Sequence, residues 1–488
     1  MKQLLLLLLS TSCLFTVAQR PPAPYGVLPS SAQLRWHELE IYGLVHWGLN
    51  TYTDKEWGYG DEDPALLQPT AFDARQIVAA AKAGGLKGLV VVAKHHDGFC
   101  LWPTQTTTHN IRKSPWKNGQ GDILREYRNA CDALGMQLGF YCSPWDRNAA
   151  SYGSAAYVDM YKAQLKELYS QYGPLFMSWH DGANGGDGYY GGARTRRTID
   201  RSAYYGWDSI WALTRKMQPG AVIFGDVGPD VRWVGNEKGF AGETSWATYT
   251  PLAPEKGKLP ANGFIIESEA VTGTRDGRYW MPAECDVPLR PGWFYHSAED
   301  DKVRSREMLI DLYFKSVGRG ACLDLGLAPD RRGQLHANDV AVLAAFGKWQ
   351  QQTFARNLLA GAWFSASNIR GRSHKKYGAG LLTDNDRYSY WATDDKVLQA
   401  ELEAQMDSIT TFNVIRLREN IKLGQRIRAV EIDSWENGAW RTIAWAGSIG
   451  ANRLIRLPGR VSTNRIRLRI TDAAASIALS DLGLFLEP

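Results

Sequence analysis

The stretch AFDARQIVAAAKAGGLKGLVVVAKHHDGF, residues 71–99, decides the fold class. Residues 71–82 have the composition of a helix, and residues 88–93 (GLVVVA) form an apolar run typical of a buried strand. A helix that leads into a buried strand is the repeating unit of parallel sheets, in which helices connect successive strands. The polar run KHHDGF follows the strand directly, at the end where such sheets bind ligands. This unit therefore predicts an α/β fold.

The same alternation continues on both sides of this unit. Further helices are predicted at residues 122–134, 157–172 and 338–354, and further strands at residues 41–47, 136–141, 174–179, 221–224, 279–284 and 321–325. About this many units over this length predict a (β/α)8-like TIM barrel, which we assign to residues 19–356. The later segments alternate less regularly, so eight uniform repeats are not predicted.

The pattern changes beyond residue 356. Apolar and polar residues alternate at 414–418 (VIRLR), 429–432 (AVEI), 453–457 (RLIRL) and 465–470 (RIRLRI), with glycine, asparagine and serine between these segments. A period of two is typical of antiparallel strands with one buried face. Residues 357–488 are therefore predicted to form a C-terminal antiparallel β-sandwich.

The N-terminus has the features of a targeting segment. Lys2 precedes an apolar run at residues 4–9, and small residues at 16–18 (TVA) provide a cleavage position before Gln19. The run is too short to span a bilayer. We therefore expect residues 1–18 to be a signal peptide and the mature protein to be exported. Cys13 resembles a lipoprotein cleavage site only weakly, because the usual leucine three residues earlier is missing.

Composition excludes several classes of partner. The net charge is +5 over 488 residues and the charges are scattered, so no nucleic-acid or polybasic membrane site is predicted. Five cysteines remain after the signal segment, an odd number without paired spacing. They predict neither a disulfide framework nor a zinc site. The oligomeric state is left open.

Polar motifs follow four of the predicted strands. They are HWG at His46, KHHDGF at Lys94, YCSPWD at Tyr141 and WHDG at Trp179. Active sites of TIM barrels lie at the C-terminal ends of the strands, so these motifs are expected to meet on one rim. Converging polar and aromatic groups are typical of a sugar pocket, although a single strand-end histidine is more often structural.

Metal binding is an alternative use of the histidines. His95 and His96 are adjacent, and neighbours in a strand point to opposite faces. No HxH or HExxH spacing occurs. No metal is therefore expected, while a mononuclear hydrolase built on these histidines and Asp181 stays open as a minor alternative.

Two carboxylates are needed for glycoside hydrolysis, one to attack the sugar or activate water and one to protonate the leaving oxygen. Asp181 follows an apolar strand and precedes Gly182, which lets backbone and substrate approach closely. The competing interpretation is an ordinary Asp-Gly turn.

The combination of motifs resembles glycoside hydrolase family 29, the retaining α-L-fucosidases. The resemblance covers most of residues 35–357 and rests on HWG at His46, EWG at Glu56, KHHDGF, YCSPWD, SWHDGANG at Ser178 and VGRGACLDLGLAPDRRG at Val317. GPDVRWVGNE at Gly228 and ECDVPLRPGWFYH at Glu284 are similar to the branch that acts on α-1,3/1,4-linked fucose. FNVIRLRENIKLGQR at Phe412 is similar to the family's sandwich domain.

The resemblance implies roles for individual residues. Asp181 matches the nucleophile and Glu237 the acid/base. Substrate binding is implied for His46, Glu56, Trp57, His95, His96, Tyr141, Trp179 and Trp293. Glu284 comes directly off the predicted strand at 279–284, so we expect it either to bind substrate from a fixed position or to support the residues that do. The expected reaction is removal of terminal L-fucose from a fucosylated oligosaccharide or glycoconjugate by double displacement, without a metal or organic cofactor. Departures from the family pattern at His180, Asp324 and Leu327 remove no catalytic group.

Three further alternatives stay open. Glu284 could replace Glu237 as the acid/base, although Glu237 is favoured because a loop residue can more easily reach the ~5 Å carboxylate separation of retaining enzymes. The chain could be another retaining exo-glycosidase, such as an α-galactosidase. It could also be a non-catalytic glycan-binding protein, but both candidate carboxylates are present.

Overall fold

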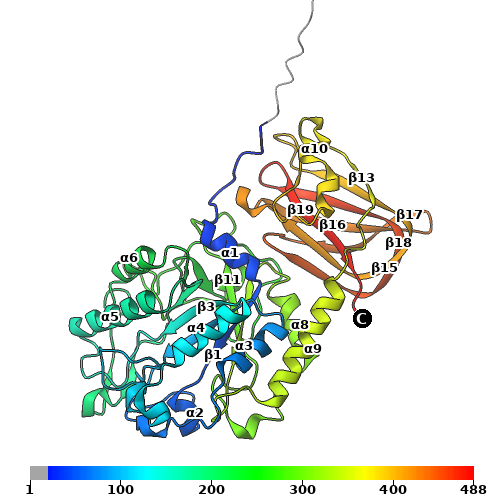
Figure 1. Ribbon diagram of the computed structural model, residues 1–488. Helices are drawn as coiled ribbons and strands as arrows, with labels where there is room; N and C mark the ends of the chain where they lie inside the picture. The colour runs from blue at the N-terminus through cyan, green and yellow to red at the C-terminus, as the bar shows by residue number, and fades with distance from the viewer. Residues whose placement is uncertain (1–19) are drawn as a thin grey trace, which may run out of the picture.

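The computed structural model describes residues 20–488 and contains two lobes (Figure 1). The blue-to-green lobe is a barrel, and the orange and red lobe is an antiparallel sheet domain. Helix α9 (Ala337–Phe354) leads from the first lobe to the second. The expected signal peptide, including Cys13, lies outside the described residues. From residue 20 onward, no helix is both long and apolar enough to cross a membrane.

Eight parallel strands close the barrel in the order β1, β12, β11, β8, β7, β4, β3, β2. Their bounds are β1 Ile41–Val45, β2 Gly88–Lys94, β3 Gln137–Cys142, β4 Met177–Trp179, β7 Val222–Gly225, β8 Val231–Trp233, β11 Ala283–Pro288 and β12 Cys322–Leu327. The predicted (β/α)8-like barrel is therefore confirmed.

The helices around the barrel begin and end where local signals predict. The longer ones are α3 Ala74–Ala83, α4 Ile123–Leu134, α5 Ala155–Gln171, α6 Trp207–Met217, α8 Arg306–Lys315 and α9. Helix α1 (Ser31–Leu39) precedes β1, and the short helices α2 (Leu49–Thr53) and α7 (Glu267–Thr272) lie in connecting segments. Asp73 and Asp122 cap α3 and α4, each accepting a backbone hydrogen bond three residues on. Gly135 ends α4 in the left-handed conformation.

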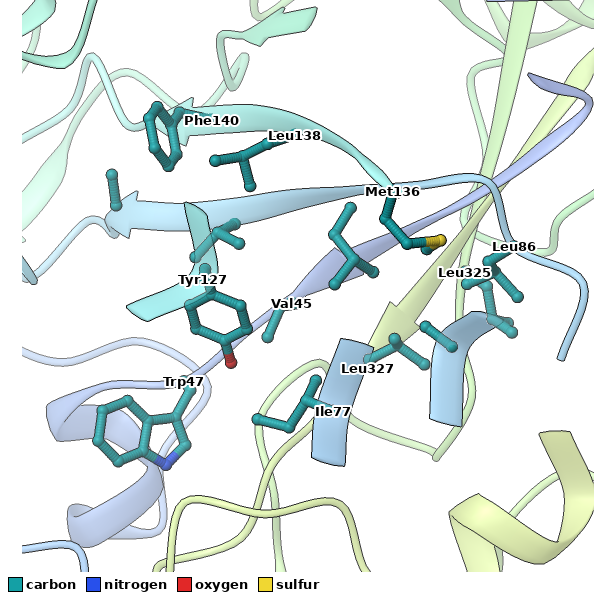
Figure 2. Close-up of a cluster of buried hydrophobic side chains, with 14 of the residues drawn as sticks. Val45, Trp47, Ile77, Leu86, Tyr127, Met136, Leu138, Phe140, Leu325 and Leu327 are labelled. Carbon is teal, nitrogen blue, oxygen red and sulfur yellow. The ribbon is translucent and has the colours of Figure 1, made fainter. Parts of the chain in front are cut away.

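Two apolar layers hold the barrel together. One lies between the strands and the surrounding helices, and Figure 2 shows part of it, where Ile77 of α3 and Tyr127 of α4 lie beside side chains of β1, β3 and β12. The other fills the barrel interior with Tyr42, Val90 and Phe224 among others, and Trp36 of α1 belongs to it. Strand side chains alternate between these layers, so residues after the strand ends are left at the rim.

Two barrel strands differ from expectation. β8 was not predicted, because it has three residues and includes Arg232, which is fully buried. The strand expected at residues 279–284 is divided: β10 (Tyr279–Trp280) pairs with β9 (Thr248–Tyr249), and the barrel strand β11 begins only at Ala283. Glu284 is therefore near the start of its strand and not at the rim.

The C-terminal domain is one antiparallel sheet whose long strands form both layers of the sandwich. Its strands are β13 Trp363–Ala366, β14 Trp391–Ala392, β15 Ala400–Glu419, β16 Ile427–Glu436, β17 Ala439–Ala446, β18 Arg453–Ala473 and β19 Ala478–Phe485. Register shifts interrupt the β15–β18 pairing, and both halves contribute to one apolar core. The predicted segments 453–457 and 465–470 are two halves of β18.

Candidate active site

Asp181 directly follows β4 and has both carboxylate oxygens fixed. Its Oδ2 accepts a hydrogen bond from the Tyr141 hydroxyl at 2.8 Å, and its Oδ1 accepts one from the backbone N–H of Ala183 at 2.7 Å. Nε2 of His96 lies 3.9 Å from Oδ2. The side chain keeps 24% of its surface exposed, so the carboxylate is oriented by the protein yet open to a ligand.

A cavity of about 440 Å³ lies beside this carboxylate. Its lining comes mainly from β4, β7, β8 and the segments that follow them. The lining residues are Trp179, Asp181, Gly182, Ala183, Phe224, Asp226, Trp233, Glu237, Gly263, Phe264, Ile265 and Asp286. Both candidate catalytic carboxylates therefore border one cavity, whose volume is in the range of small-molecule sites.

A cluster of histidine and aromatic rings adjoins Asp181 through His96. The rings of His95 and His96 are 4.1 Å apart, those of His46 and Trp293 are 5.1 Å apart, and those of Trp57 and His96 are 5.2 Å apart. The expectation that His95 and His96 point to opposite faces is wrong, because β2 ends at Lys94 and both histidines lie in the turn that follows.

Burial keeps these histidines neutral. It lowers the pKa of His46 to about 3 and that of His96 to about 4, and it lowers the pKa of His95 well below its ordinary value. A neutral imidazole has one donor and one acceptor nitrogen, which suits hydrogen bonds to sugar hydroxyls. The three rings are therefore available as ligands for a neutral polar molecule.

Glu56 connects its own loop to the segment 293–296 by hydrogen bonds. Its carboxylate accepts hydrogen bonds from the backbone N–H groups of Trp293 at 2.9 Å and Phe294 at 3.1 Å, and from Nε2 of His296 at 2.8 Å. Trp57, the next residue, is 55% exposed at the mouth of the site. Glu56 thus holds the Trp293 segment against the loop that carries Trp57.

Glu237 lies in the loop after β8 and is exposed at the rim of the cavity. Partial burial of its carboxyl raises its pKa, the charges of Asp181 and Glu56 raise it further, and a hydrogen bond with Trp293 opposes them. A carboxyl with a raised pKa beside a carboxylate is the arrangement expected of an acid and nucleophile pair.

Glu284 lies beneath the cavity and does not line it. It is fully buried and accepts hydrogen bonds from the Trp179 indole N–H at 2.7 Å and from the Tyr42 hydroxyl. Burial raises its pKa, and the neighbouring Asp324 stays protonated because its own pKa is raised further by burial and by the charge of Glu284. Trp179 lies between Glu284 and the cavity, so of the two roles expected for Glu284 the arrangement favours support of a binding residue over direct contact with substrate.

Several cavity residues were not predicted from the sequence. Asp226 and Asp286 line the cavity, together with Trp233 and Phe264. His180, by contrast, follows a strand end but points away, between Ser178 at 2.9 Å and the Tyr161 hydroxyl at 2.7 Å. Across residues 20–488, no group of three or more His, Cys, Asp or Glu side chains is arranged to hold a metal ion.

Comparison with known proteins agrees with this geometry. Residues 25–353 match the family model described as Alpha-L-fucosidase. Alpha-L-fucosidase 1 of Arabidopsis thaliana is 35% identical over 469 residues, covering 96% of this chain and 89% of that protein. A Ruminococcus gnavus GH29 fucosidase in complex with fucose aligns with a TM-score of 0.85 at 30% identity, covering 96% of this chain and 97% of that one. A glycoside hydrolase 29 family member from an unknown rumen bacterium aligns with a TM-score of 0.84 at 36% identity, covering 95% and 78%. The chain therefore belongs to glycoside hydrolase family 29, the alpha-L-fucosidases.

Proposed function

We propose that this alpha-L-fucosidase releases terminal L-fucose with retention of configuration, with Asp181 as the nucleophile and Glu237 as the acid/base. The observation that carries the proposal is the pairing of a fixed carboxylate with a carboxyl of raised pKa on one cavity. Hydrogen bonds to both oxygens hold Asp181 in one orientation, which reduces the entropy lost when it attacks the sugar.

The reaction takes place in two displacements. In the first, an oxygen of Asp181 forms an ester bond to the anomeric carbon while the glycosidic bond breaks, and the proton of Glu237 moves to the leaving oxygen. In the second, ionised Glu237 takes a proton from water, the water oxygen attacks the same carbon and the ester bond breaks. Fucose then leaves with its original configuration.

The histidine side of the site is proposed to bind the fucose ring. His46, His95 and His96 are neutral and can exchange hydrogen bonds with sugar hydroxyls without the cost of burying a charge. Trp57 and Trp293 provide apolar ring surface, and we assign Trp293 to the C6 methyl group that distinguishes fucose from galactose. Glu56 acts on the same side by holding Trp293 in place.

The preferred substrates are proposed to be glycans with α-1,3- or α-1,4-linked fucose. The motifs GPDVRWVGNE and ECDVPLRPGWFYH support this, and the cavity beside Glu237 leaves room for a branched leaving group. Contacts to the neighbouring sugar would then supply binding energy that is realised in the transition state.

Export is proposed on the basis of the sequence of residues 1–18. Expression of the full chain in a bacterial host, followed by N-terminal sequencing of the protein from each cell fraction, tests it. Recovery of protein that begins at Gln19 outside the cytoplasm supports export, whereas protein that keeps Met1 in the cytoplasm contradicts it.

Two experiments test the catalytic proposal. Proton NMR of the first fucose formed from an aryl fucoside should show the α-anomer before mutarotation, and an initial β-anomer would exclude retention. A panel of defined oligosaccharides should show faster cleavage of Lewis-type trisaccharides than of α-1,2-fucosyl lactose. Equal or faster cleavage of the α-1,2 linkage would contradict the proposed specificity while leaving the mechanism intact.

A further inference from the structure

A third carboxyl stands at the same level of the barrel as Asp181. Trp179 at the end of β4 is in register with Phe224 of β7, and the two strands are neighbours. Asp181 lies two residues beyond Trp179, and Asp226 lies two residues beyond Phe224. Because neighbouring strands are about 4.8 Å apart, the two carboxyls stand side by side on the rim.

Asp226 is held against the segment that follows the nucleophile. Its Oδ2 accepts a hydrogen bond from the backbone N–H of Gly263 at 2.7 Å. A Cβ atom on Gly182 would lie only 2.0 Å from this oxygen, so only glycine at position 182 allows so close an approach. The position of Asp226 is therefore set by two glycines from different segments.

One oxygen of Asp226 is left for a ligand. The residue is 8% exposed and lines the cavity, yet among residues 20–488 the only hydrogen-bond partner of its carboxyl is Gly263, which takes Oδ2. Burial, and next to it the charge of Asp181, raises the pKa of Asp226 to about 7, against the Gly263 hydrogen bond and the charge of Arg201. Below that pH the carboxyl can both donate to and accept from a hydroxyl group.

The order of the strands places Asp226 on the leaving-group side. Going round the barrel, β3, β2 and β1 follow β4 on one side, and β7 and β8 follow it on the other. The histidines assigned to fucose come from the ends of β1 and β2, whereas Glu237, which must protonate the leaving oxygen, follows β8. Asp226 stands between Asp181 and the Glu237 loop.

We propose that Asp226 is a specificity-determining residue that hydrogen-bonds a hydroxyl group of the sugar from which fucose is released. Half-buried Phe264 and Ile265, next to Gly263 in the lining, provide the apolar wall that a sugar ring packs against. The assignment rests on the proposed catalytic function, because the side of the leaving group is defined by Asp181 and Glu237.

The test compares a Lewis-type trisaccharide with 4-nitrophenyl fucoside, which has no sugar in the leaving group. In Asp226→Ala, the ratio of kcat/KM for the trisaccharide to kcat/KM for the aryl fucoside should fall by roughly ten- to a hundredfold, the effect of one lost hydrogen bond to an ionisable group. In Asp226→Asn the ratio should fall less, because the amide can still donate or accept a hydrogen bond. Asp187→Asn, which alters an exposed carboxylate of the nearby β5–β6 hairpin (Gly186–Gly188 and Thr195–Arg197), is the matched control and should leave the ratio unchanged.

Trisaccharides that lack single hydroxyl groups on the leaving sugar make the test independent of protein stability. With the wild-type enzyme, one such analogue should lose about tenfold or more in kcat/KM, and Asp226→Ala should no longer distinguish it from the parent. An unchanged ratio, an equal loss on both substrates, or no sensitive hydroxyl in the wild type overturns the role of Asp226. Failure of the wild type to hydrolyse any fucoside would instead overturn the proposed function.

Discussion

The hydroxyl group of Tyr141 donates a 2.8 Å hydrogen bond to Oδ2 of Asp181. The ring of Tyr141 also stacks on Trp179, with centroids 4.9 Å apart. The indole N–H of Trp179 in turn donates a hydrogen bond to Glu284 beneath the cavity. The orientation of the proposed nucleophile is therefore coupled to the floor of the cavity through one tyrosine, since its ring and its hydroxyl group act on different partners.

Tyr141→Phe should lower kcat by roughly 10- to 100-fold, because a hydrogen bond to a charged group contributes about 1.5–3 kcal/mol. The stack on Trp179 is kept, so the melting temperature should change little. Tyr172→Phe is the control, because it removes a similar buried hydroxyl–carboxylate bond, to Asp122 at 2.9 Å, far from the site. Equal kcat values for the two variants would show that Tyr141 does not act on the nucleophile.

Asp181→Asn should lower kcat by roughly 10⁴-fold or more, the scale seen when a covalent nucleophile is removed. The amide oxygen can still accept the Ala183 hydrogen bond and the amide NH2 group can donate to the Tyr141 hydroxyl, so circular dichroism and thermal unfolding should match the wild type. Asp181→Gly with added azide should form β-fucosyl azide, because the anion attacks from the face that the carboxylate occupied. Wild-type turnover in Asp181→Asn, or the α-azide from Asp181→Gly, would contradict the assignment.

Glu237→Ala should slow substrates with poor leaving groups far more than nitrophenyl fucoside, which needs little protonation. Azide should restore turnover in this variant and give α-fucosyl azide, since it attacks the covalent intermediate. Glu284→Gln should slow all leaving groups by a similar factor, because Glu284 lies behind Trp179 and does not reach the glycosidic oxygen. Leaving-group dependence in Glu284→Gln and not in Glu237→Ala would exchange the two roles.

The barrel and most of the site could be predicted because apolar strands and the polar motifs after them are adjacent in sequence. His46, His96, Tyr141 and Asp181 come together for this reason alone. Asp226 obeys the same rule, since it follows the predicted strand at 221–224 within two residues. Its position beside Asp181, however, depends on the register of β7 against β4. Register is set by packing between distant segments, which the sequence pattern does not show.

The position of Glu284 and the strand β8 were not predicted correctly for the same reason: the sequence pattern does not show how deep in the barrel a polar residue lies. The predicted strand at 279–284 ends at Glu284, which would put this residue at the rim, whereas β11 runs from Ala283 to Pro288 through buried Asp286. Buried carboxyls and the buried Arg232 of β8 interrupt the apolar pattern that marks a strand. Such groups are tolerated because neighbours satisfy them, as the Met281 and Ala270 carbonyls do for Arg232.

The alkaline limb of the pH–activity profile should move in opposite directions in two variants. Glu237 must be protonated in the first step, so kcat/KM falls as the pH rises through its pKa. The charge of Glu56 raises that pKa and the bond from Trp293 lowers it. Glu56→Gln should therefore move the alkaline limb to lower pH, and Trp293→Phe should move it to higher pH. These shifts do not depend on how much each substitution lowers the maximal kcat/KM. A shift in the same direction for both would contradict the assignment of this limb to Glu237.

Protein stability should fall with rising pH because of a buried carboxyl behind the histidines. Burial, and after it the charge of Glu62, raises the pKa of Asp97 to about 8. An unfolded aspartate titrates near 3.9, so from about pH 4 to about pH 8 the folded protein holds a proton that the unfolded chain has lost. Stability from this group is complete below the unfolded pKa, falls by about 1.4 kcal/mol per pH unit as the pH rises from there to the folded pKa, and is then fully lost.

Asp97→Asn removes this titration and keeps an oxygen that can accept the 2.9 Å hydrogen bond from the backbone N–H of Phe99. The free energy of unfolding of the variant should therefore rise relative to that of the wild type as the pH rises, because the Asn side chain stays neutral in both the folded and the unfolded state. Chemical denaturation at intervals from pH 5 to pH 9 measures this difference directly. The gap should widen up to about pH 8 and then become constant. A gap that is the same at every pH would show that Asp97 is ionised in the folded protein over the whole range, and a gap that narrows with rising pH would equally contradict a raised pKa.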